Sequence, residues 1–490
     1  MFSNSQIKEF FKNQTVFLTG GSGFLGKILM EKLLRECEEI KKIYVLLRPK
    51  KGKTPEQRFK ELFNHPCFDV LKSKHTNHLE KVFLVNGDCN EPLLGLAEQD
   101  VAILLKETTC VIHAAANVKF DQTLKEATSY VRATKDLLEF AKRMLNLKVF
   151  VFVSTAFSNC VHSHITEQFY EPPMKPEKLL DLVNILDDDT LQAITPQLLN
   201  TWPNTYVYTK SVSENLIKTI GADLPITIVR PAIVISTIAE PIPGWIDNFY
   251  GLVGVSSGAA LGVIRSMNAN PNYRAPLVPV DYVSNCILAA AWKRGRSDTT
   301  TIYNYVGHEN NQITWGRYMR ILEEQGWNVP PEKILWYFSF KIRKNRLWHK
   351  FCVFFLHTVT AYMVDFVLLC LGRPTLAVEK YRRLNRTLDL LAYFGTKTWK
   401  FDDGNVVELW NDMNDADKRQ FCFNMENIDF NSYGRHLVMG ARYYLFHETP
   451  ATIPKAKRKM NMLFFVHYTV IGVFWYILFK LIKFFLSLFF

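Results

Sequence analysis

The stretch Thr19-Gly-Gly-Ser-Gly-Phe-Leu-Gly26 decides how this chain folds. It directly follows a short apolar run, Thr15-Val-Phe-Leu18, and it precedes residues 27–36, whose apolar side chains have helical spacing. A glycine-rich loop between a strand and a helix is typical of dinucleotide-binding folds, because the loop and the helix N-terminus can hold a pyrophosphate. The sequence therefore predicts a dinucleotide site near the N-terminus.

Apolar runs of strand length recur after this loop and alternate with stretches of helical apolar spacing, up to about residue 290. The runs lie at residues 42–47, 82–85, 110–112, 149–153 and 226–229. Runs that are apolar throughout, with helices between them, are typical of a parallel sheet buried on both faces. We therefore expect an α/β fold with a Rossmann-like, doubly wound parallel sheet.

Each glycine of the loop has an expected role. Gly20 would permit the tight turn, Gly23 would let the backbone approach a pyrophosphate, and Gly26 would let the helix pack closely on the sheet. The phosphates would then meet the positive end of the helix dipole. The cofactor-binding residues that this loop predicts are Thr19, Gly20, Ser22, Gly23, Phe24, Leu25 and Gly26.

The end of the second expected strand favours NADPH over NADH. Proteins that bind NAD often place an acidic side chain here, which holds the ribose hydroxyls. This chain has Arg48, followed by Lys50 and Lys51, and Arg48 can pair with a 2′-phosphate. A basic loop that only faces solvent is the alternative interpretation. The sequence therefore predicts NADPH as the cofactor.

Two positions after later strands complete the expected cofactor site. Asp88 follows the third strand, where it could accept a hydrogen bond from the adenine amine or could simply close a turn, and both interpretations fit the sequence. Ala115 follows the fourth strand. Small residues there would let the nicotinamide half of the cofactor lie close to the sheet.

A tyrosine and a lysine four residues apart, Tyr206 and Lys210, lie in an otherwise helical pattern and therefore share a helix face. Hydride attack on a carbonyl creates an oxyanion that needs a proton. A tyrosine can supply it near pH 7 when a neighbouring cation lowers its pKa. Lys210 can provide that cation while it holds the nicotinamide ribose. Tyr208 is a competitor, but only Tyr206 is four residues from the lysine.

Ser154 and Thr155 follow the strand expected at residues 149–153, and the carboxyl ends of parallel strands carry the ligand sites of such folds. The Thr155 hydroxyl can donate to a carbonyl oxygen and polarise it. We therefore predict Tyr206, Lys210, Thr155 and Ser154 as catalytic residues. With the glycine loop, they indicate a nicotinamide-dependent reductase that uses a tyrosine as its acid.

Residues 160–205 interrupt the alternation of strands and helices. They include an expected loop at residues 171–176 and an acidic run at residues 187–189. A solvated insertion and a lid that positions the substrate explain this segment equally well.

The last part of the chain carries the strongest membrane signal. Residues 462–479 have no formal charge, and as a helix they rise about 27 Å, just enough to cross the hydrocarbon core of a bilayer. The basic run at residues 455–459 should keep the main domain in the cytosol. The earlier apolar run at residues 351–371 contains Asp365, and a carboxylate at bilayer depth costs about 2.5–3.5 kcal/mol. We therefore favour a packed or membrane-dipping helix there over a span.

The composition agrees with a membrane-attached protein of several domains. The chain has 490 residues, 48% of them hydrophobic, with a mean hydropathy of −0.04 and a net charge of +12. No zinc-finger or aromatic-rich pattern accompanies the basic clusters, so they suit membrane lipid or phosphate-rich ligands and not nucleic acid. The nine cysteines lack metal-ligand spacing, and we predict no metal site.

We predict three regions along the chain. A reductase domain would occupy residues 1–345, a smaller helical domain residues 346–450, and a transmembrane tail residues 455–490.

These motifs resemble the extended short-chain dehydrogenase/reductase superfamily and, more closely, the alcohol-forming fatty acyl-CoA reductases. The resemblance extends over most of the chain, and its most specific stretch is Pro243-Gly-Trp-Ile-Asp-Asn248. The family often has proline where this chain has Thr360, which leaves the path of that helix open, and threonine where it has Ser22. Residues 251–253 also depart from the family pattern.

The resemblance implies that a long-chain fatty acyl-CoA and two NADPH give a primary fatty alcohol and free CoA, by way of an aldehyde. It implies substrate contacts from Trp245, Asn248 and Phe249, although core packing accounts for the two aromatic residues equally well. It also implies the membrane of the endoplasmic reticulum or of the peroxisome. A hydroxysteroid dehydrogenase and a non-catalytic scaffold on the same fold are the alternatives. The sequence leaves chain length and oligomeric state open.

Overall fold

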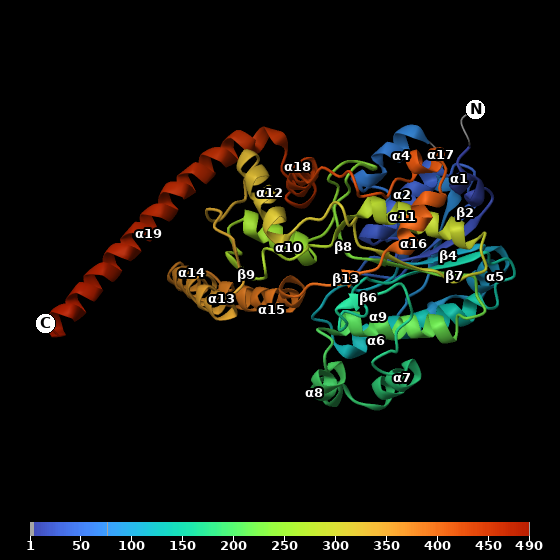
Figure 1. The fold of residues 1–490 in the computed structure, drawn as a ribbon, viewed down its shortest axis with the longest axis horizontal. Helices are drawn as coiled ribbons and strands as arrows, with labels where there is room; N and C mark the ends of the chain where they lie inside the picture. The colour runs from blue at the N-terminus through green and yellow to red at the C-terminus, as the bar shows by residue number, and fades with distance from the viewer. Residues whose placement is uncertain (1–3, 76, 490) are drawn as a thin grey trace. The chain divides into compact units, whose positions relative to one another are not determined.

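The computed structural model describes residues 4–75 and 77–489, and the chain forms two compact units (Figure 1). The first, which we call the sheet unit, comprises Met1–Ile246, Arg274–Ile313 and Lys397–Asp429. The second, the helical unit, comprises Asp247–Tyr273, Thr314–Thr396 and Phe430–Phe490.

The chain passes between the two units repeatedly, so the units differ from the linear division at residues 345 and 450 that the sequence predicts. Residues 397–429 return to the sheet unit, where β13 (Lys400–Phe401) pairs with β6 (His164–Ile165). Phe421 and Phe423 are buried there. Composition does not reveal this return, because a two-residue strand and two aromatic side chains cause no change in charge or hydropathy along the sequence.

Seven parallel strands form the main sheet in the order β11-β7-β5-β4-β1-β2-β3. They are β1 Thr15–Thr19, β2 Lys42–Leu47, β3 Val82–Asn86, β4 Cys110–His113, β5 Val149–Val153, β7 Ile226–Pro231 and β11 Ile302–Tyr305. The expected Rossmann-like parallel sheet is confirmed, and only β11 lies outside the predicted runs. The strand order reverses between β1 and β4, which is where open α/β sheets bind ligands.

Helices cover both faces of this sheet (Figure 1). α2 (Phe24–Glu36) and α11 (Val280–Arg294) pack together on one face, and α6 (Leu124–Ala141) and α9 (Thr205–Thr219) pack together on the other. The smaller elements of the unit are α1 Gln6–Phe11, α3 Pro55–Leu62, α4 Asp69–Lys74, α5 Glu98–Glu107, α7 Pro176–Ile185, α8 Asp188–Leu199, β8 Ile233–Ile235, β10 Leu277–Pro279, α16 Gly404–Asp412 and α17 Asp415–Gln420.

The interrupted segment at residues 160–205 contains β6, α7 and α8. Its acidic run forms the start of α8, because the Asp187 side chain accepts a hydrogen bond from Thr190 N at 2.9 Å. Acidic residues at a helix N-terminus are stabilised by the helix dipole. The acidic run therefore has a local structural role.

The helical unit contains the remaining elements. They are α10 Gly251–Ala260, β9 Ser266–Asn268, α12 Trp315–Asn328, β12 Lys341–Arg343, α13 Arg346–Val353, η4 Phe354–Val359, α14 Thr360–Cys370, α15 Ala377–Thr396, α18 Phe430–Gly440, η5 Ala441–Leu445, η6 Pro450–Thr452 and α19 Ile453–Phe489. The expected helical C-terminal region is thereby confirmed.

Asp365, the charged residue of the earlier apolar run, lies at the surface of this unit. Its carboxylate accepts hydrogen bonds from Ala377 N at 2.8 Å and Val378 N at 2.9 Å, at the start of α15. These two bonds hold the pKa of Asp365 below its usual value. The carboxylate thus fastens α14 to α15 as a helical hairpin.

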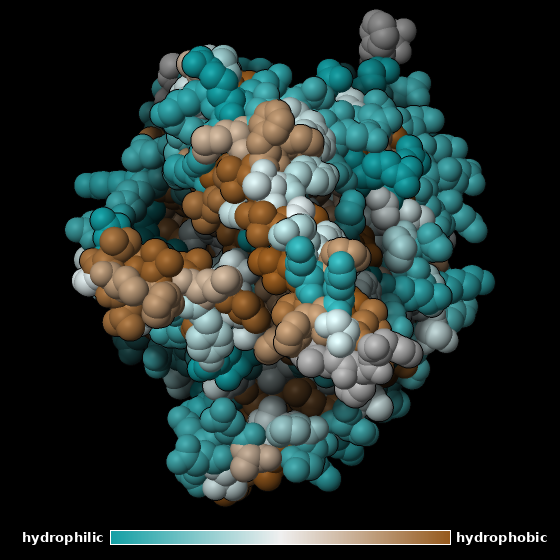
Figure 2. Space-filling model, turned by 90° about the vertical axis from the view of Figure 1, so that its left-hand side faces the viewer, coloured by the Kyte–Doolittle hydropathy of each residue, from teal (hydrophilic) through white to brown (hydrophobic). Residues whose placement is uncertain are grey.

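Two segments of the described residues are long and apolar enough to cross a membrane, Arg346–Cys370 and Pro450–Phe484. Many of their large apolar side chains are exposed. Figure 2 looks onto the helical unit from the side of α13, α14 and α19, and hydrophobic patches are visible on this face. Both segments are therefore compatible with membrane association.

Candidate active site

The glycine loop lies at the reversal point of the sheet. Gly20 has a φ of +76°, and a Cβ on it would lie 2.7 Å from the backbone of Ala114, in the segment that follows β4. Gly23 N donates to Gly20 O at 2.9 Å as the chain enters α2. A Cβ on Gly26 would lie only 2.2 Å from Gly20 O. Gly20 and Gly26 are therefore required for the close approach of loop, helix and neighbouring strand.

A buried histidine, His113, ties this loop to the end of β4. Its Nδ1 lies 2.7 Å from Thr19 Oγ1, and its Nε2 lies 3.2 Å from Thr134 Oγ1. Because Thr134 donates its own proton to Tyr130 O, it accepts from His113 Nε2–H, and Nδ1 then accepts from Thr19. Burial lowers the pKa of His113 to about 3, so the ring is neutral. His113 was not predicted as a site residue, because it belongs to no motif with a characteristic spacing.

A cluster of cations borders the glycine loop. Arg58, from α3, donates to Ser22 Oγ at 2.9 Å and to Arg48 O at 2.5 Å. Arg48 itself pairs with Asp88 at 3.1 Å. Burial and the neighbouring Arg58 and Arg48 lower the pKa of Lys50. The cluster carries more positive than negative charge and therefore suits a phosphate. Arg58 was not predicted as a member of it, because nothing in the helical pattern of α3 marks this residue.

Asp88 has two partners in the structure. Besides Arg48, it accepts from Asn90 N at 2.9 Å, which is the hydrogen bond of an Asx turn. Ala115 lies on the other side of the loop, where its N–H points to Thr19 Oγ1 at 3.4 Å. The predicted positions Phe24 and Leu25 form the first turn of α2.

Tyr206, Lys210 and Ala115 line one small pocket. The Asn204 side chain starts α9 by accepting from Val207 N at 3.0 Å, which places Tyr206 in the first turn. Gln122 also lines this pocket, and its buried Oε1 has no hydrogen-bond partner among the described residues.

The electrostatics of the pair differ from the sequence-based expectation. Burial raises the pKa of Tyr206 to about 12, and a hydrogen bond with Thr155 opposes the rise. Lys210 Nζ donates to Val153 O at 2.8 Å, and burial lowers the pKa of this ammonium to about 8. The loss of water around the phenol therefore sets the direction in which the pKa of Tyr206 shifts.

The two hydroxyls after β5 have different surroundings. Ser154 Oγ donates to Glu214 Oε1 at 2.5 Å, and Glu214 pairs with the fully buried Arg230 at 2.7 Å. Thr155 Oγ1 instead donates to Pro231 O at 3.4 Å and accepts from Phe157 N at 3.3 Å, and Thr155 also lowers the pKa of Tyr206. Thr155 is therefore the hydroxyl that acts on the predicted acid, whereas Ser154 belongs to a buried ionic network. Glu214 was missed, although it lies one further turn along α9, four residues after Lys210.

The predicted substrate residues belong to both units of the chain. Trp245 is buried in the sheet unit and stacks on Phe24, with ring centroids 5.3 Å apart. Asn248 and Phe249 belong to the helical unit, where Asn248 bonds with the neighbouring Asp247 and Tyr250. Phe249 is 51% exposed, and its ring lies 6.1 Å from that of Phe446.

In the described residues, no group of three or more His, Cys, Asp or Glu side chains could hold a metal ion.

A glycine loop at the reversal point of a parallel sheet, beside a pocket lined by Tyr206 and Lys210, defines a nicotinamide-dependent reductase of the short-chain dehydrogenase type. A family model for NAD-binding described as "male sterility protein" matches residues 18–287, and a second model of that description, Sterile, matches residues 356–448.

Curated relatives match almost the whole chain. It is 38% identical to "fatty acyl-CoA reductase wat" of Drosophila melanogaster over 98% of this chain and 94% of the relative. It is 35% identical to "fatty acyl-CoA reductase 1" of Homo sapiens over 94% of this chain and 90% of the relative. The chain therefore belongs to the fatty acyl-CoA reductase family.

Solved structures agree in fold. The terminal R domain of the myxalamid PKS-NRPS pathway aligns with a TM-score of 0.59 and 19% identity, over 89% of this chain and 92% of that one. The reductase domain of a non-ribosomal peptide synthetase from Mycobacterium tuberculosis aligns with a TM-score of 0.57 and 16% identity, over 90% and 96%. At such identities the likeness concerns the fold alone.

Proposed function

We propose that this protein reduces long-chain fatty acyl-CoA to primary fatty alcohol, with NADPH as the reductant and CoA as the second product. The pocket shared by Tyr206 and Lys210, directly beside the glycine loop, carries the proposal. Membership of a family whose curated relatives are named fatty acyl-CoA reductases supplies the substrate class.

The site residues can perform the proposed chemistry in two rounds. NADPH supplies a hydride to the thioester carbon in the first round. Thr155 polarises the carbonyl oxygen and Tyr206 gives it a proton, which yields a hemithioacetal. Its collapse breaks the carbon–sulfur bond and releases CoA thiol and an aldehyde. A second NADPH would then supply the second hydride, and Tyr206, after it has regained a proton from water, would give the proton that converts the aldehyde to the alcohol. Lys210 holds the nicotinamide ribose.

Basic residues beside the glycine loop support the choice of NADPH. Arg58 donates to Ser22 Oγ at 2.9 Å and to the backbone oxygen of Arg48, so an extra phosphate on the adenosine ribose near Ser22 would meet positive charge. Thr19, Gly20, Gly23, Phe24, Leu25, Gly26, Ala115 and Asp88 remain our proposed cofactor contacts.

We also propose that α19 anchors the protein as a single-pass C-terminal helix with the catalytic part in the cytosol. The exposed apolar side chains that follow Met462 and the basic residues at 455–459 support this topology. The membrane is that of the endoplasmic reticulum, with the peroxisome as the alternative. We propose that α13 and α14 dip into the same membrane, because Asp365 is bonded to the start of α15.

Product analysis tests the proposed reaction. Membranes that contain the full-length protein are incubated with NADPH and palmitoyl-CoA or stearoyl-CoA, and lipids are identified by gas chromatography, with Tyr206→Phe as the control. We expect hexadecanol or octadecanol from the wild type only. Aldehyde as the sole product would refute the second reduction. Reduction of a steroid ketone without turnover of acyl-CoA would assign the protein to a different substrate class.

A further inference from the structure

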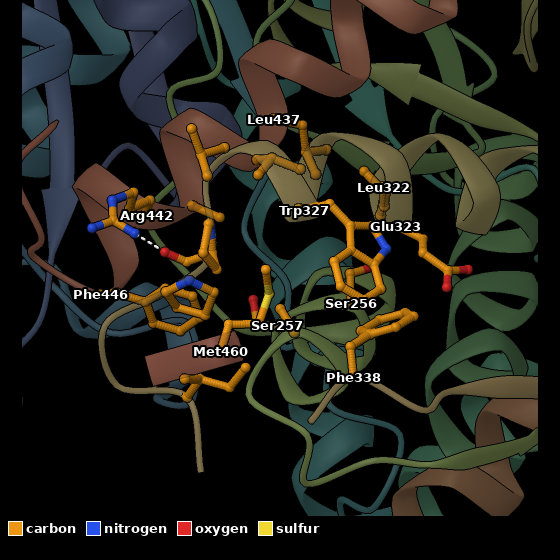
Figure 3. Close-up of a pocket in the computed structure, with 18 of the residues that line it drawn as sticks. Ser256, Ser257, Leu322, Glu323, Trp327, Phe338, Leu437, Arg442, Phe446 and Met460 are labelled. Carbon is orange, nitrogen blue, oxygen red and sulfur yellow. Dashed lines mark hydrogen bonds between the residues drawn. The ribbon is translucent and has the colours of Figure 1, made fainter. Parts of the chain in front are cut away.

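The helical unit contains an apolar pocket that the site described above does not include (Figure 3). It lies between α10, α12, α18 with η5, the first turns of α19 and the segment at residues 329–338, and its empty space, open solvent included, is about 780 Å³. Its wall includes Val253, Leu322, Trp327, Phe338, Leu437 and Phe446. Pockets for small ligands in proteins are lined mainly by apolar side chains, as this one is.

The charged groups of this pocket are paired or point outward. Arg442 is buried, forms a 3.1 Å ion pair with Glu448 and donates to Pro330 O. The Glu323 carboxylate points away from the other labelled side chains (Figure 3). Ser256 lies 3.5 Å from the Tyr318 hydroxyl. The interior therefore suits a ligand part that carries no charge, because burying an unpaired charge there would be costly.

The pocket wall extends onto the helix that we assign to the membrane. Met460 lines the pocket and is 6% exposed, and Phe464, four residues later and therefore on the same face of α19, is 37% exposed. Lys455 pairs with Glu332 at 2.7 Å, which connects the start of this helix to the segment that forms another side of the pocket. The apolar face of α19 that lines the pocket thus continues into the part of the helix that we assign to the membrane.

We propose that this pocket holds the hydrocarbon chain of the fatty acyl substrate, and that its size sets the chain length that the enzyme accepts. The inference rests on the proposed function for the identity of the ligand. It assigns chain selection to α10, α12 and α18, away from the predicted residues Trp245 and Asn248.

Gly326 on α12 gives a sharp test. It lines the pocket, and a Cβ added to it meets no atom within 4 Å. Gly326→Leu therefore adds an apolar side chain at the pocket wall without displacing the backbone. Gly472→Leu is the matched control, because Gly472 is also helical, has the same free space and lies outside the pocket lining.

The first readout is the ratio of kcat/KM for stearoyl-CoA to that for lauroyl-CoA. Because single methylenes change selectivity in apolar pockets by about tenfold or more, we expect Gly326→Leu to lower this ratio at least about tenfold. The control Gly472→Leu should keep the wild-type ratio. An unchanged ratio in Gly326→Leu would overturn the proposal.

The second readout does not depend on turnover. Full-length protein in lipid nanodiscs is irradiated with stearoyl-CoA that carries a diazirine at the chain end, and labelled peptides are mapped by mass spectrometry. We expect labels on α10, α12 or α18, also in Tyr206→Phe, and fewer in Gly326→Leu. Labels in the pocket without acyl-CoA turnover would refute the proposed reaction and retain the hydrocarbon site. Turnover with labels only elsewhere would refute the site and retain the reaction.

Discussion

Two tyrosines that lie two residues apart on α9, Tyr206 and Tyr208, have different surroundings. Tyr206 lines the pocket with Lys210, whereas Tyr208 is fully buried and meets Trp202 edge-on, with ring centroids 6.1 Å apart. The Tyr208 hydroxyl has no hydrogen-bond partner among the described residues. Helical geometry explains the difference, because residues two apart face opposite sides of a helix, and the four-residue spacing to Lys210 selects Tyr206.

This pair of tyrosines gives the first prediction. Tyr206→Phe should lower kcat by about 10²–10⁴-fold, because it removes the acid and leaves the ring. Tyr208→Phe should keep wild-type turnover, and it should not lower the melting temperature, because the lost hydroxyl is buried and unpaired. Steady-state kinetics and thermal unfolding of both variants provide the measurement. Equal losses of turnover in the two variants would remove Tyr206 from its assigned role.

Lys210 predicts a distinctive pH dependence. Burial lowers its pKa from 10.5 to about 8, so the folded protein gives up this proton at a lower pH than the unfolded chain. The ammonium that we assign to the ribose is lost as the pH rises through about 8, and kcat/KM should fall there. The free energy of unfolding should instead increase as the pH rises above about 8.

Between about pH 8 and 10.5 the unfolded chain binds more protons at this position, so stability should rise with pH. The comparison is with Lys210→Met, which lacks the titrating group. We expect wild-type stability to rise relative to Lys210→Met across this window while wild-type activity falls. A kcat/KM that stays constant up to pH 10 would contradict the assignment.

The cations beside the glycine loop make the choice of cofactor testable. Arg48→Ala and Arg58→Ala should each raise KM for NADPH by tenfold or more and change KM for NADH little, because only NADPH carries the 2′-phosphate. Lys53→Ala is a suitable control, since Lys53 is exposed and pairs with Glu61. Equal increases for both cofactors would mean that the two arginines support the loop and do not read the phosphate.

Among the elements, those of the sheet could be predicted from sequence wherever apolar runs were long and bounded. The run at residues 42–47 matches β2 residue for residue. β11 escaped prediction because Ile302-Tyr-Asn-Tyr305 is short and contains a polar residue, Asn304, whose amide donates to Asp402 O at 2.8 Å. Its pairing with β7 brings together residues more than seventy positions apart, which local patterns do not encode.

The residues of the candidate site also divide into those that a sequence pattern marks and those that no pattern marks. Tyr206, Lys210 and the loop glycines follow spacing rules that chemistry imposes, so they could be predicted as site residues from the sequence alone. Arg58 and His113 act through contacts with residues far along the chain, at Ser22 and Thr134, and no spacing rule marks them.

The close packing of loop and helix at the junction of β1 and α2 leads to a prediction about NADPH binding. Gly26→Ala places a Cβ 2.2 Å from Gly20 O, so the loop must move. We expect NADPH binding, measured by fluorescence titration, to weaken at least tenfold while the protein remains folded by circular dichroism. Gly404→Ala, on α16 of the same unit, has its nearest atom at 4.0 Å and should bind NADPH normally. Unchanged NADPH binding in Gly26→Ala would show that the loop can move without weakening its contacts with the cofactor.

At the scale of the whole molecule, the chain alternates between two units, and each unit is completed by segments distant in sequence. The start of α19 belongs to this framework, because Ala456 and Met460 are buried in the helical unit. A truncation that removes the membrane segment should therefore keep all residues up to 461. Truncation at residue 455 would also remove part of the pocket wall.

Deletion of residues 462–490 tests the two membrane contacts that we propose. The truncated protein should leave cell membranes in alkaline carbonate, because we assign the membrane span to α19. It should still bind vesicles that contain phosphatidylserine, through exposed Phe351, Phe354 and Phe355 and the basic residues near them, each basic residue contributing about 1 kcal/mol.

Replacing these three phenylalanines by serine in the truncated protein should abolish vesicle binding in flotation assays and leave NADPH binding unchanged. Three Phe→Leu replacements at the same positions serve as the control, because they keep an apolar surface. Resistance of the truncated protein to carbonate would mean that residues 346–370 cross the bilayer. Asp365 would then have to leave the start of α15, because the bonds that it makes there hold α14 beside a charged surface helix.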